Sequence, residues 1–535
     1  MNLLLINLTR FGDLLQMQPL LHGLAAEGHR IGLVCLDNFA GATALLRHVD
    51  HVFPLPGGRL LAALESDWRH AAAHVRLLRQ EIETTFPVDG VLNLTATLSA
   101  RLLARHCTPA GVPLLGFAMD AHGFGINADP WTTFLQASTR QRGCSPFNLV
   151  DLFRHAAGVG HHPPRNELCP PTQHMLAETR ARLEALAPAG AAGYVALQLG
   201  ASENRRRWPV ASFATVARTL WEAHRLCPVL LGTRAERHLA DRFAASVGAP
   251  CIDLVGETSL EQLSATLLHT RLLVTNDTGT MHLAAGLGVP CLAIFLATAQ
   301  PWDTGPYLPD CCCLEPALDC HPCPFASPCP HNERCRTTIT PETVNALLAA
   351  RLAGDTWEAP HHASAQTRIW RTHFNAEGFH DLHSLSGHER DDRTVWIRLQ
   401  RHYYRQFLDR EMTSSPADGT PQPYQHPQLV HLPSASLQAA ITTTLAQAEA
   451  LFHLLEQQGT LLSMQPNDMT KQRFLGTCGK VRALFDSAPR FNVLEHLWLT
   501  ESQQAGDNLS NVLALAARYR QLAKEWRTAL QPHSE

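Results

Sequence analysis

A polar turn between two apolar runs, residues 275–282 (TNDTGTMH), carries the strongest chemical signal in the chain. The apolar runs predict buried parallel strands, and the residues between them predict one helix. Asp277 or Thr278 can cap that helix, and Gly279 lets another molecule approach the backbone closely. An uncovered helix start favours an anion, usually a phosphate. The structural alternative is an ordinary capped helix in a βαβ unit.

A second polar turn, residues 9–13 (TRFGD), follows the first apolar run and precedes a helix expected from about Leu14. Ligands of open α/β sheets bind beyond the carboxyl ends of strands, so Asp13 stands where a reactive carboxylate is useful. Gly12 permits an unusual backbone, and Arg10 can hold the carboxylate ionised or bind an anionic acceptor. The structural alternative for Asp13 is a helix N-cap or first-turn acid.

Three consecutive arginines stand in a third loop, residues 200–209 (GASENRRRWP). Arginine binds phosphate oxygens bidentately, which suits a loop facing a diphosphate, whereas the alternative is a solvated run of charge. We expect Trp208 to pack against the next helix rather than stack on a base. The loops 231–236 (LGTRAE) and 256–260 (GETSL) place small or polar residues where a nucleoside would lie. Together with the turn at 275–282, these three loops are expected to lie on one edge of one sheet.

The elements that must position these loops alternate between strand-like runs and helical stretches, twice along the chain. This alternation is typical of doubly wound parallel sheets and predicts an α/β fold with two Rossmann-like halves. Beyond them, a Pro-, Gln-, Ser- and Thr-rich stretch reads as a linker, and Leu and Ala then recur at helical spacing. The expected parts are a first domain at 1–170, a second at 171–350, a basic and aromatic segment with linker at 351–433, and a mainly α-helical extension at 434–535.

The composition of the chain limits the classes of function and the cellular compartment that we expect. A chain of 535 residues is longer than one hydrophobic core normally supports, so two or three domains are expected. Apolar residues make up 45% of the chain, which is enough to form buried cores. A net charge of −4 does not favour nucleic-acid binding. The amino terminus lacks the features of a signal peptide, and no apolar stretch is long enough to span a bilayer, so we expect a cytoplasmic protein. Fifteen cysteines in that compartment indicate thiols or metal ligands before disulfides.

Over about residues 1–350 the chain resembles glycosyltransferase family 9, the lipopolysaccharide heptosyltransferases. The most specific parts of the match are R-x-G-D at 10–13, the basic residue two before Trp208, and D-T-G-x-x-H-L-A-A at 277–285. The resemblance implies the GT-B architecture, in which two Rossmann-like domains face a cleft. It also implies transfer of a heptose from ADP-heptose with inversion and with no cofactor required.

The resemblance assigns roles to single residues. Asp13 would be the general base for the acceptor hydroxyl, and Arg206, where the family often has lysine, would neutralise the leaving diphosphate. Displacement at an anomeric carbon needs such a base and such a cation, and here they come from different halves, so the halves must close. Arg10 and Gly12 fall on the acceptor side. The donor-binding residues would be Ser202, Arg206, Glu236, Thr258, Asp277, Thr278, Gly279 and His282.

A cysteine-rich loop, residues 311–335, contains a C-x2-C-x5-C-x5-C pattern. Four thiolates in one loop can close a tetrahedral zinc or iron site, with His321 or His331 as an alternative ligand. The related autotransporter heptosyltransferases hold iron with a cysteine cluster, whereas the structural alternative is a loop of reduced thiols. The four candidate ligands are Cys320, Cys323, Cys329 and Cys335.

Three functions stay open. The leading hypothesis is a heptosyltransferase acting on lipopolysaccharide core or a related cell-surface acceptor. The second keeps the donor but makes the acceptor a protein, as in the autotransporter enzymes, and the third is a noncatalytic nucleotide-sugar-binding scaffold. The residues after 355 offer a surface for oligomerisation, for docking an acceptor protein, or for peripheral contact with the inner membrane through the Arg-rich part 368–410.

Overall fold

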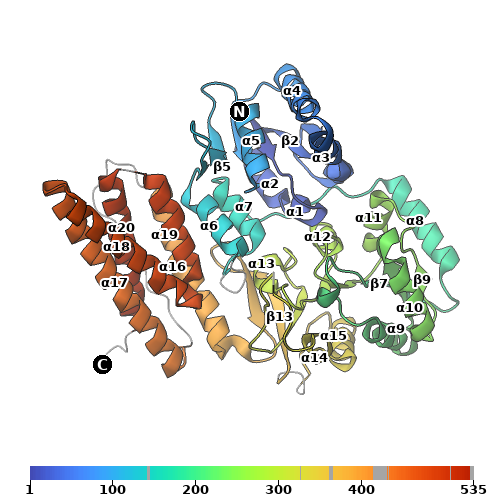
Figure 1. Cartoon of the computed structure of the whole chain (residues 1–535). Coiled ribbons are helices and arrows are strands. Elements are labelled where there is room, and N and C mark those ends of the chain that lie inside the picture. The colour runs from blue at the N-terminus through green and yellow to red at the C-terminus, as the bar shows by residue number, and fades with distance from the viewer. Residues whose placement is uncertain are drawn as a thin grey trace. The chain divides into compact units, whose positions relative to one another are not determined.

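The chain divides into two compact units (Figure 1). The first comprises Met1–Gly125 and Phe147–Gly387, and the second comprises Ile126–Pro146 and His388–Glu535. Most of the expected linker, residues 414–430, lies outside the described residues. This computed structural model describes residues 1–140, 145–325, 327–360, 365–413, 431, 433–506 and 508–530.

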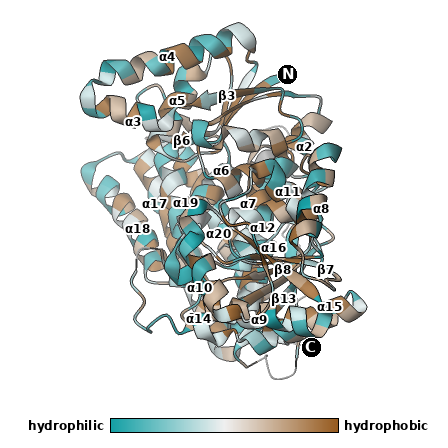
Figure 2. Ribbon diagram, turned by 90° about the vertical axis from the view of Figure 1, so that its right-hand side faces the viewer, coloured by the Kyte–Doolittle hydropathy of each residue, from teal (hydrophilic) through white to brown (hydrophobic). Residues whose placement is uncertain are grey.

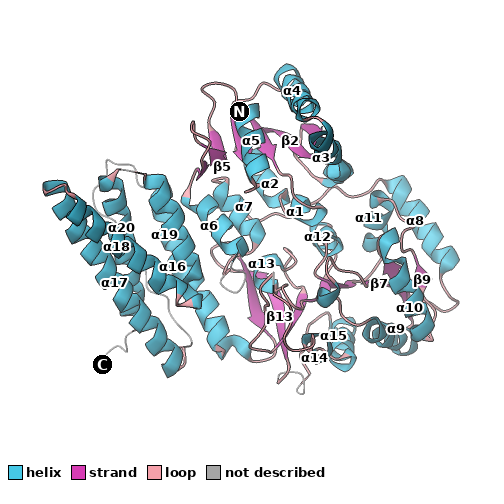
Figure 3. Cartoon of the chain, in the orientation of Figure 1, coloured by secondary structure: helices cyan, strands magenta, loops and turns pink. Residues whose placement is uncertain are grey.

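The first unit begins with a parallel sheet in which the strand order is β3-β2-β1-β4-β5. Helices accompany these strands (Figure 3). Because β1 lies between β2 and β4, the winding reverses beside β1, and the crevice for a ligand falls at its carboxyl end. The elements are β1 (Asn2–Ile6), α1 (Phe11–Leu15), α2 (Gln18–Ala26), β2 (Arg30–Leu36), η1 (Asp37–Leu45), β3 (His51–Leu55), α3 (Gly57–Ser66), α4 (Trp68–Thr85), β4 (Gly90–Asn93), α5 (Leu98–Cys107), β5 (Leu114–Met119) and β6 (Gly125–Asn127).

The second sheet of this unit has the order β14-β13-β12-β11-β10-β7-β8-β9. The adjacent strands β7 and β8 consist largely of hydrophobic residues (Figure 2). The winding reverses between β7 and β10, so the loops that follow these two strands are neighbours. The elements are α7 (Leu149–Ala156), α8 (Gln173–Leu186), β7 (Gly193–Gln198), η3 (Asn204–Arg206), α9 (Val210–His224), β8 (Leu226–Leu231), η4 (Arg234–Glu236), α10 (Arg237–Val247), β9 (Ile252–Asp253), α11 (Leu260–Leu268), β10 (Leu273–Asn276), α12 (Gly279–Gly286), β11 (Cys291–Ile294), α13 (Pro301–Thr304), β12 (Cys312–Pro316), α14 (Cys335–Thr338), α15 (Pro341–Gly354), β13 (Thr367–Phe374) and β14 (His380–Ser384).

The far edge of this sheet departs from the sequence expectation. Cys312 and Cys313 are fully buried in strand β12, so the start of the expected cysteine-rich loop is a core strand. The stretch expected to open a basic segment from residue 351 includes β13 and β14, which extend the sheet antiparallel beyond residue 350. Arg368 fits there because its guanidinium donates to the carbonyl of Pro316 at 2.9 Å.

The second unit is helical, as expected for the extension. Ser434 caps its longest helix by accepting from the N–H of Leu437 at 3.3 Å. None of the described helices contains a stretch apolar enough to cross a membrane. Two Rossmann-like domains followed by helices confirm the expected GT-B type of fold. The helices are α6 (Pro130–Arg140), η5 (His388–Arg390), α16 (Asp392–Thr413), α17 (Ala435–Met464), α18 (Asp468–Asp486), η6 (Pro489–Phe491), α19 (Asn492–Ala505) and α20 (Leu509–Ala529).

The Arg-rich part 368–410 is less exposed than a membrane-contacting surface requires. Arg368 and Arg401 are buried, and the Nε of Arg401 donates to the carbonyl of Pro146 at 2.9 Å. Guanidinium groups held on carbonyls inside the protein do not reach anionic lipid headgroups. The structure therefore removes two of the arginines on which the expected membrane contact rested.

Candidate active site

Two helix starts, those of α1 and α12, lie directly against each other. A Cβ atom added to Gly279 would be 2.5 Å from the ring Cδ1 of Phe11. A Cβ atom on Gly12 would be 3.1 Å from the ring of His282. Glycine is therefore required on the α12 side, and the contact places Asp13 of the first sheet beside the polar turn of the second.

Helix α1 begins at Phe11, not near Leu14 as expected, so Asp13 belongs to its first turn. The half-buried carboxylate of Asp13 accepts from the backbone N–H of Arg10 at a long 3.4 Å. The turn before the helix is fixed by the N–H of Leu8, which donates to the hydroxyl of Thr95 at 2.9 Å. Asp13 thus follows a turn that is anchored to the loop after the neighbouring strand β4.

Arg206 is the arginine that faces the turn after β10. Its Nη1 donates to the hydroxyl of Ser202 at 3.0 Å, and its Nη2 makes an ion pair with the carboxylate of Asp277. The side chains of Arg206 and Asp277 are only 12% and 7% exposed. The Nε of Arg206 is buried and has no hydrogen-bond partner among the described residues. The guanidinium is therefore fixed in place and still has a donor to offer.

The two neighbouring arginines have other partners. Arg205 donates to the carbonyls of Phe325 and Ser327 at 2.7 and 2.8 Å, which ties the loop to the cysteine-containing segment. Arg207 donates to the carbonyl of Ala201 at 3.1 Å. The alternative of a solvated charge run is therefore wrong, because each arginine makes a specific contact.

A buried amide joins the loops after β7 and β10. The Nδ2 of Asn276 donates to the carbonyls of Leu199 and Gly200 at 3.0 and 3.1 Å, and its Oδ1 accepts from the N–H of Trp208 at 2.8 Å. The ring of Trp208 is fully buried, and its Nε1 donates to the carbonyl of Ile339 at 2.9 Å. The prediction that Trp208 packs rather than stacks on a base is confirmed. Sequence reasoning did not single out Asn276, although its place at the end of a buried strand was visible.

The start of α12 lacks a side-chain cap. Thr278 occupies the N-cap position, but its side chain makes no capping hydrogen bond. The carboxylate of Asp277 contacts Arg206 and the hydroxyl of Thr304 instead. The expected capping by Asp277 or Thr278 is therefore wrong. The N–H of Met281 donates to the carbonyl of Thr278 at 3.1 Å, whereas the first two N–H groups of the helix are left for another acceptor, and the helix dipole makes an anion the favoured one.

Glu236 connects to the same region through Gln198. Its Oε2 accepts from the N–H of Thr233 at 2.7 Å and from the amide of Gln198 at 3.5 Å. The amide oxygen of Gln198 accepts from the hydroxyl of Thr280 at 3.3 Å. A Cβ on Gly200 would overlap the Glu236 carboxylate at 1.4 Å, so the absence of a side chain there lets the carboxylate lie against the loop.

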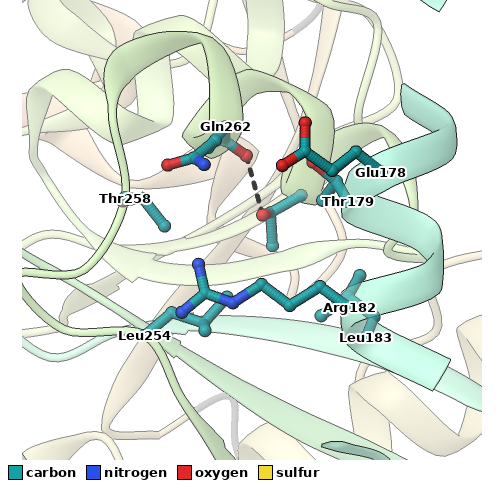
Figure 4. A pocket seen from close by; sticks show the side chains of 8 residues that line it. Glu178, Thr179, Arg182, Leu183, Leu254, Thr258 and Gln262 are labelled. Carbon is teal, nitrogen blue, oxygen red and sulfur yellow. Dashed lines mark hydrogen bonds between the residues drawn. The ribbon is translucent and has the colours of Figure 1, made fainter. Parts of the chain in front are cut away.

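Thr258 lies against a separate, small cavity between α8 and α11, lined also by Arg182 and Gln262 (Figure 4). The cavity has a volume of about 40 Å³ and does not include Arg206 or Asp277. Ligand pockets measure roughly 300–1,000 Å³, so this space is too small for a nucleoside. Thr258 therefore lines a cavity that contains none of the other predicted donor-binding residues.

His282 stays neutral at ordinary pH. Burial lowers its pKa to about 4, although the nearby Asp277 carboxylate acts in the opposite direction. A histidine whose pKa is lower in the folded state than in the unfolded state destabilises the fold in acid, because the unfolded chain binds the proton. The loss starts as the pH falls below about 6.5, continues down to about 4, and amounts to about 3 kcal/mol.

Lowering the pH from 7 to 4.5 should lower the melting temperature of the His282→Gln variant less than that of the unmodified chain, because glutamine does not titrate. The difference should be several degrees for a loss of this size. His174→Gln is the matched control, since the side chain of His174 is 88% exposed. Equal acid sensitivity of the His282→Gln variant and the unmodified chain would show that His282 is not buried in its neutral form.

The four candidate metal-binding cysteines lie near one another. Burial raises the pKa of the Cys323 thiol, and Cys335, Cys320 and Cys329 raise it further, because nearby thiolates would repel its charge. No three of these sulfur atoms lie within 4.8 Å of one another. The four thiols thus lie in one region, but their sulfur atoms are not arranged as the four ligands of a tetrahedral metal site.

The two histidines considered as alternative metal ligands, His321 and His331, have different contacts. His321 is buried, and its Nε2 lies 3.1 Å from the carboxylate of Glu315, which occupies that ring nitrogen. The backbone N–H of His331 donates to the sulfur of Cys329 at 3.4 Å, as does that of Glu333. Such N–H donors help to hold a thiolate on a metal. The backbone of His331 therefore lies beside the sulfur of Cys329.

Comparisons with known proteins match the part of the chain that contains most of the second sheet. Residues 149–331 match the family glycosyltransferase family 9 (heptosyltransferase). Lipopolysaccharide heptosyltransferase 2 of Salmonella typhimurium is 33% identical over 95 residues, which are 17% of this chain and 27% of that protein. Lipopolysaccharide heptosyltransferase 1 of Pseudomonas aeruginosa is 33% identical over 132 residues, which are 25% of this chain and 36% of that protein. The chain thus matches about a quarter to a third of the length of these relatives.

Solved structures with a similar course include ADP-heptose lipopolysaccharide heptosyltransferase II from E. coli, with a TM-score of 0.48 and 18% identity over 66% of this chain and 99% of that one. The dodecameric iron-containing heptosyltransferase TibC, in complex with ADP-D-β-D-heptose, gives a TM-score of 0.38 and 12% identity over 65% of this chain and 75% of that one. The matched segment 149–331 contains the Arg206 loop, the uncapped start of α12 and most of the cysteine cluster. Over residues 149–331 the chain is thus similar to glycosyltransferase family 9.

Proposed function

We propose that the chain transfers a heptose from ADP-heptose to an acceptor hydroxyl, with inversion at the anomeric carbon. The observation that carries the proposal is the contact between α1 and α12. It brings the helix of Asp13 against an uncapped helix start, next to which Arg206 is held by Ser202 and Asp277. A base and an anion-binding group from different sheets are what such a displacement requires.

The donor side of the reaction is assigned to the second sheet. As the glycosidic bond breaks, negative charge develops on the leaving diphosphate, and the first-turn N–H groups of α12 and the guanidinium of Arg206 stabilise it. Because Arg206 is already fixed by its two partners, little reorganisation opposes this step. His282 is neutral and adds no charge to the site.

The acceptor side is assigned to the first sheet. Asp13 accepts the proton of the acceptor hydroxyl while that oxygen attacks the anomeric carbon. The attack comes from the side opposite the diphosphate, since the base and the cation belong to different domains, and a single displacement of this kind inverts the configuration. No metal is assigned a step in it.

The acceptor we propose is lipopolysaccharide core, in keeping with the names of the relatives. A protein acceptor is the second candidate, and the thiols gathered at residues 320–335 are the feature of this chain that a metal-containing enzyme of that kind would need. In that case Cys320, Cys323, Cys329 and Cys335 would hold the metal ion. We place the reaction in the cytoplasm, since all described cysteines are free thiols, as is usual in a reducing compartment.

Thermal melting in the presence of a panel of ADP- and UDP-sugars tests the donor assignment. A ligand that binds the folded chain raises its melting temperature in proportion to the logarithm of its excess over the dissociation constant. ADP-heptose at about 100 times that constant should contribute about 2.7 kcal/mol. A clear shift with a UDP-sugar and none with ADP-heptose would overturn the assignment.

A further inference from the structure

A cluster of histidines surrounds a carboxylate well apart from the proposed active site, where α2 ends. The Nε2 of His162 lies 3.3 Å from Oε1 of Glu27, and the Nε2 of His161 lies 3.6 Å from the same oxygen. The Nε2 of His29 lies 3.3 Å from the other oxygen, Oε2. Among the described residues this is the one place where three ligand atoms of His, Cys, Asp or Glu lie within 4.8 Å of one another.

These separations match the spacing of ligands around a small divalent ion. Zinc binds imidazole nitrogen and carboxylate oxygen at roughly 2.0–2.2 Å, and tetrahedral angles then place neighbouring ligand atoms about 3.3–3.5 Å apart. Glu27 and His161 are 35% and 65% exposed, so an ion can enter and water can complete its coordination. Imidazole and carboxylate together suit zinc, nickel or copper better than magnesium or calcium.

The segment that carries His161 and His162 is held from behind by a buried arginine. The Nη2 of Arg154 donates to the carbonyls of Gly160, at 3.0 Å, and of His162. Arg154 is 1% exposed, and its Nη1 donates to Asp151 at 3.2 Å and to the hydroxyl of Tyr307 at 3.0 Å. Ligands on a backbone fixed in this way lose little entropy when an ion binds.

Packing restricts the same segment further. A Cβ on Gly160 would be 2.5 Å from the ring of His155, which stacks on Phe379 at a centroid distance of 4.7 Å. A Cβ on Gly23 of α2 would be 2.8 Å from Val159. The end of α2 and the histidine segment are therefore in close contact before any ion is present.

We propose that Glu27, His161 and His162 bind a divalent transition-metal ion of the zinc class, with His29 as a further ligand. The ion would join the corner between α2 and β2 of the first sheet to the segment that leads into the second sheet. It would act as a clamp on the connection between the two Rossmann-like domains. The competing account is a metal-free group of hydrogen-bonded histidines around one carboxylate.

Titration of the full chain with Co²⁺ and Zn²⁺, after treatment with a chelator, tests the site. Cobalt bound by thiolates absorbs strongly in the near ultraviolet, so ions at the cysteine cluster and ions at a thiolate-free site are counted separately. We expect one thiolate-free equivalent, with affinity at least about tenfold weaker in His162→Asn and in Glu27→Gln. His174→Asn is the matched control, because His174 lies 3.9 Å from a single carboxylate, Glu178.

Both variants change exposed or half-exposed side chains, and the carbonyl of His162 keeps its bond to Arg154, so the fold should be retained. Circular dichroism checks that expectation. A thiolate-free equivalent that persists unchanged in both variants, or a chain that binds cobalt only through thiolates, would overturn the proposal. Neither outcome bears on the donor or on Asp13.

Discussion

Replacing Asp13 with alanine is expected to lower the transfer rate constant by roughly 10²–10⁴-fold, the usual contribution of a general base. The dissociation constant for ADP-heptose should change by less than about threefold, because the donor-side groups come from the second sheet. Single-turnover transfer and calorimetric donor binding measure the two quantities separately. Asp13→Asn should be nearly as inactive, since an amide fills the same space without accepting the proton.

The size of the expected loss of rate distinguishes a general-base role of Asp13 from a purely structural role. An acidic residue in the first turn of a helix stabilises it by roughly 0.3–1 kcal/mol, and the bond from Arg10 to Asp13 is long at 3.4 Å. A structural role therefore predicts a modest loss of stability and little loss of rate. Asp37→Ala is the matched control, because Asp37 lies in the first turn after the neighbouring strand β2. An Asp13→Ala chain within tenfold of normal activity would remove Asp13 from the mechanism.

Replacing Arg206 with methionine is expected to lower the transfer rate by roughly 10²–10³-fold, through lost stabilisation of the leaving diphosphate. Donor affinity should fall as well. Arg206→Lys should retain part of the activity, because lysine keeps the charge but cannot hold Ser202 and Asp277 at once as the guanidinium does. Arg207→Met is the control, since it removes an equal charge from the same loop, and the guanidinium of Arg207 donates to a backbone carbonyl, that of Ala201.

The Arg206 change also has a structural cost that can be separated from the catalytic one. Without Arg206 the buried carboxylate of Asp277 loses its ion pair, and breaking such a pair typically costs about 3–5 kcal/mol. The double variant Arg206→Met with Asp277→Asn removes the unpaired charge, so its melting temperature should recover. Its activity should stay low. Recovery of activity together with stability would show that Arg206 serves only to neutralise Asp277.

Much of the fold could be predicted because its signals are local. The apolar runs and polar turns at residues 9–13 and 275–282 indicated where strands end and helices begin, and the sheet order then placed the loops on one edge. The start of α1 was misplaced by three residues. The ring of Phe11, the first residue of the helix, packs on Gly279, and such a contact between distant segments is not visible in a local pattern.

The errors lie where tertiary contacts override composition. Cys312 and Cys313 stand at the start of the expected cysteine-rich loop, yet they lie in a buried strand. The Arg- and His-bearing stretch 367–374 is a strand because Ile369 and Trp370 are buried and Arg368 reaches a carbonyl. The pairing of Glu27 with His161 and His162 joins residues far apart in the sequence, so no spacing could have indicated it.

Turnover of ADP-heptose by the purified chain tests the central claim most directly. The chain is incubated with ADP-heptose and with lipopolysaccharide core that lacks heptose, and released ADP and acceptor mass are followed together. We predict one ADP released for each heptose added, with the product inverted at the anomeric carbon and with no turnover by the Asp13→Ala variant. Tight binding of ADP-heptose without release of ADP, on lipopolysaccharide and protein acceptors alike, would contradict the account and indicate a noncatalytic scaffold.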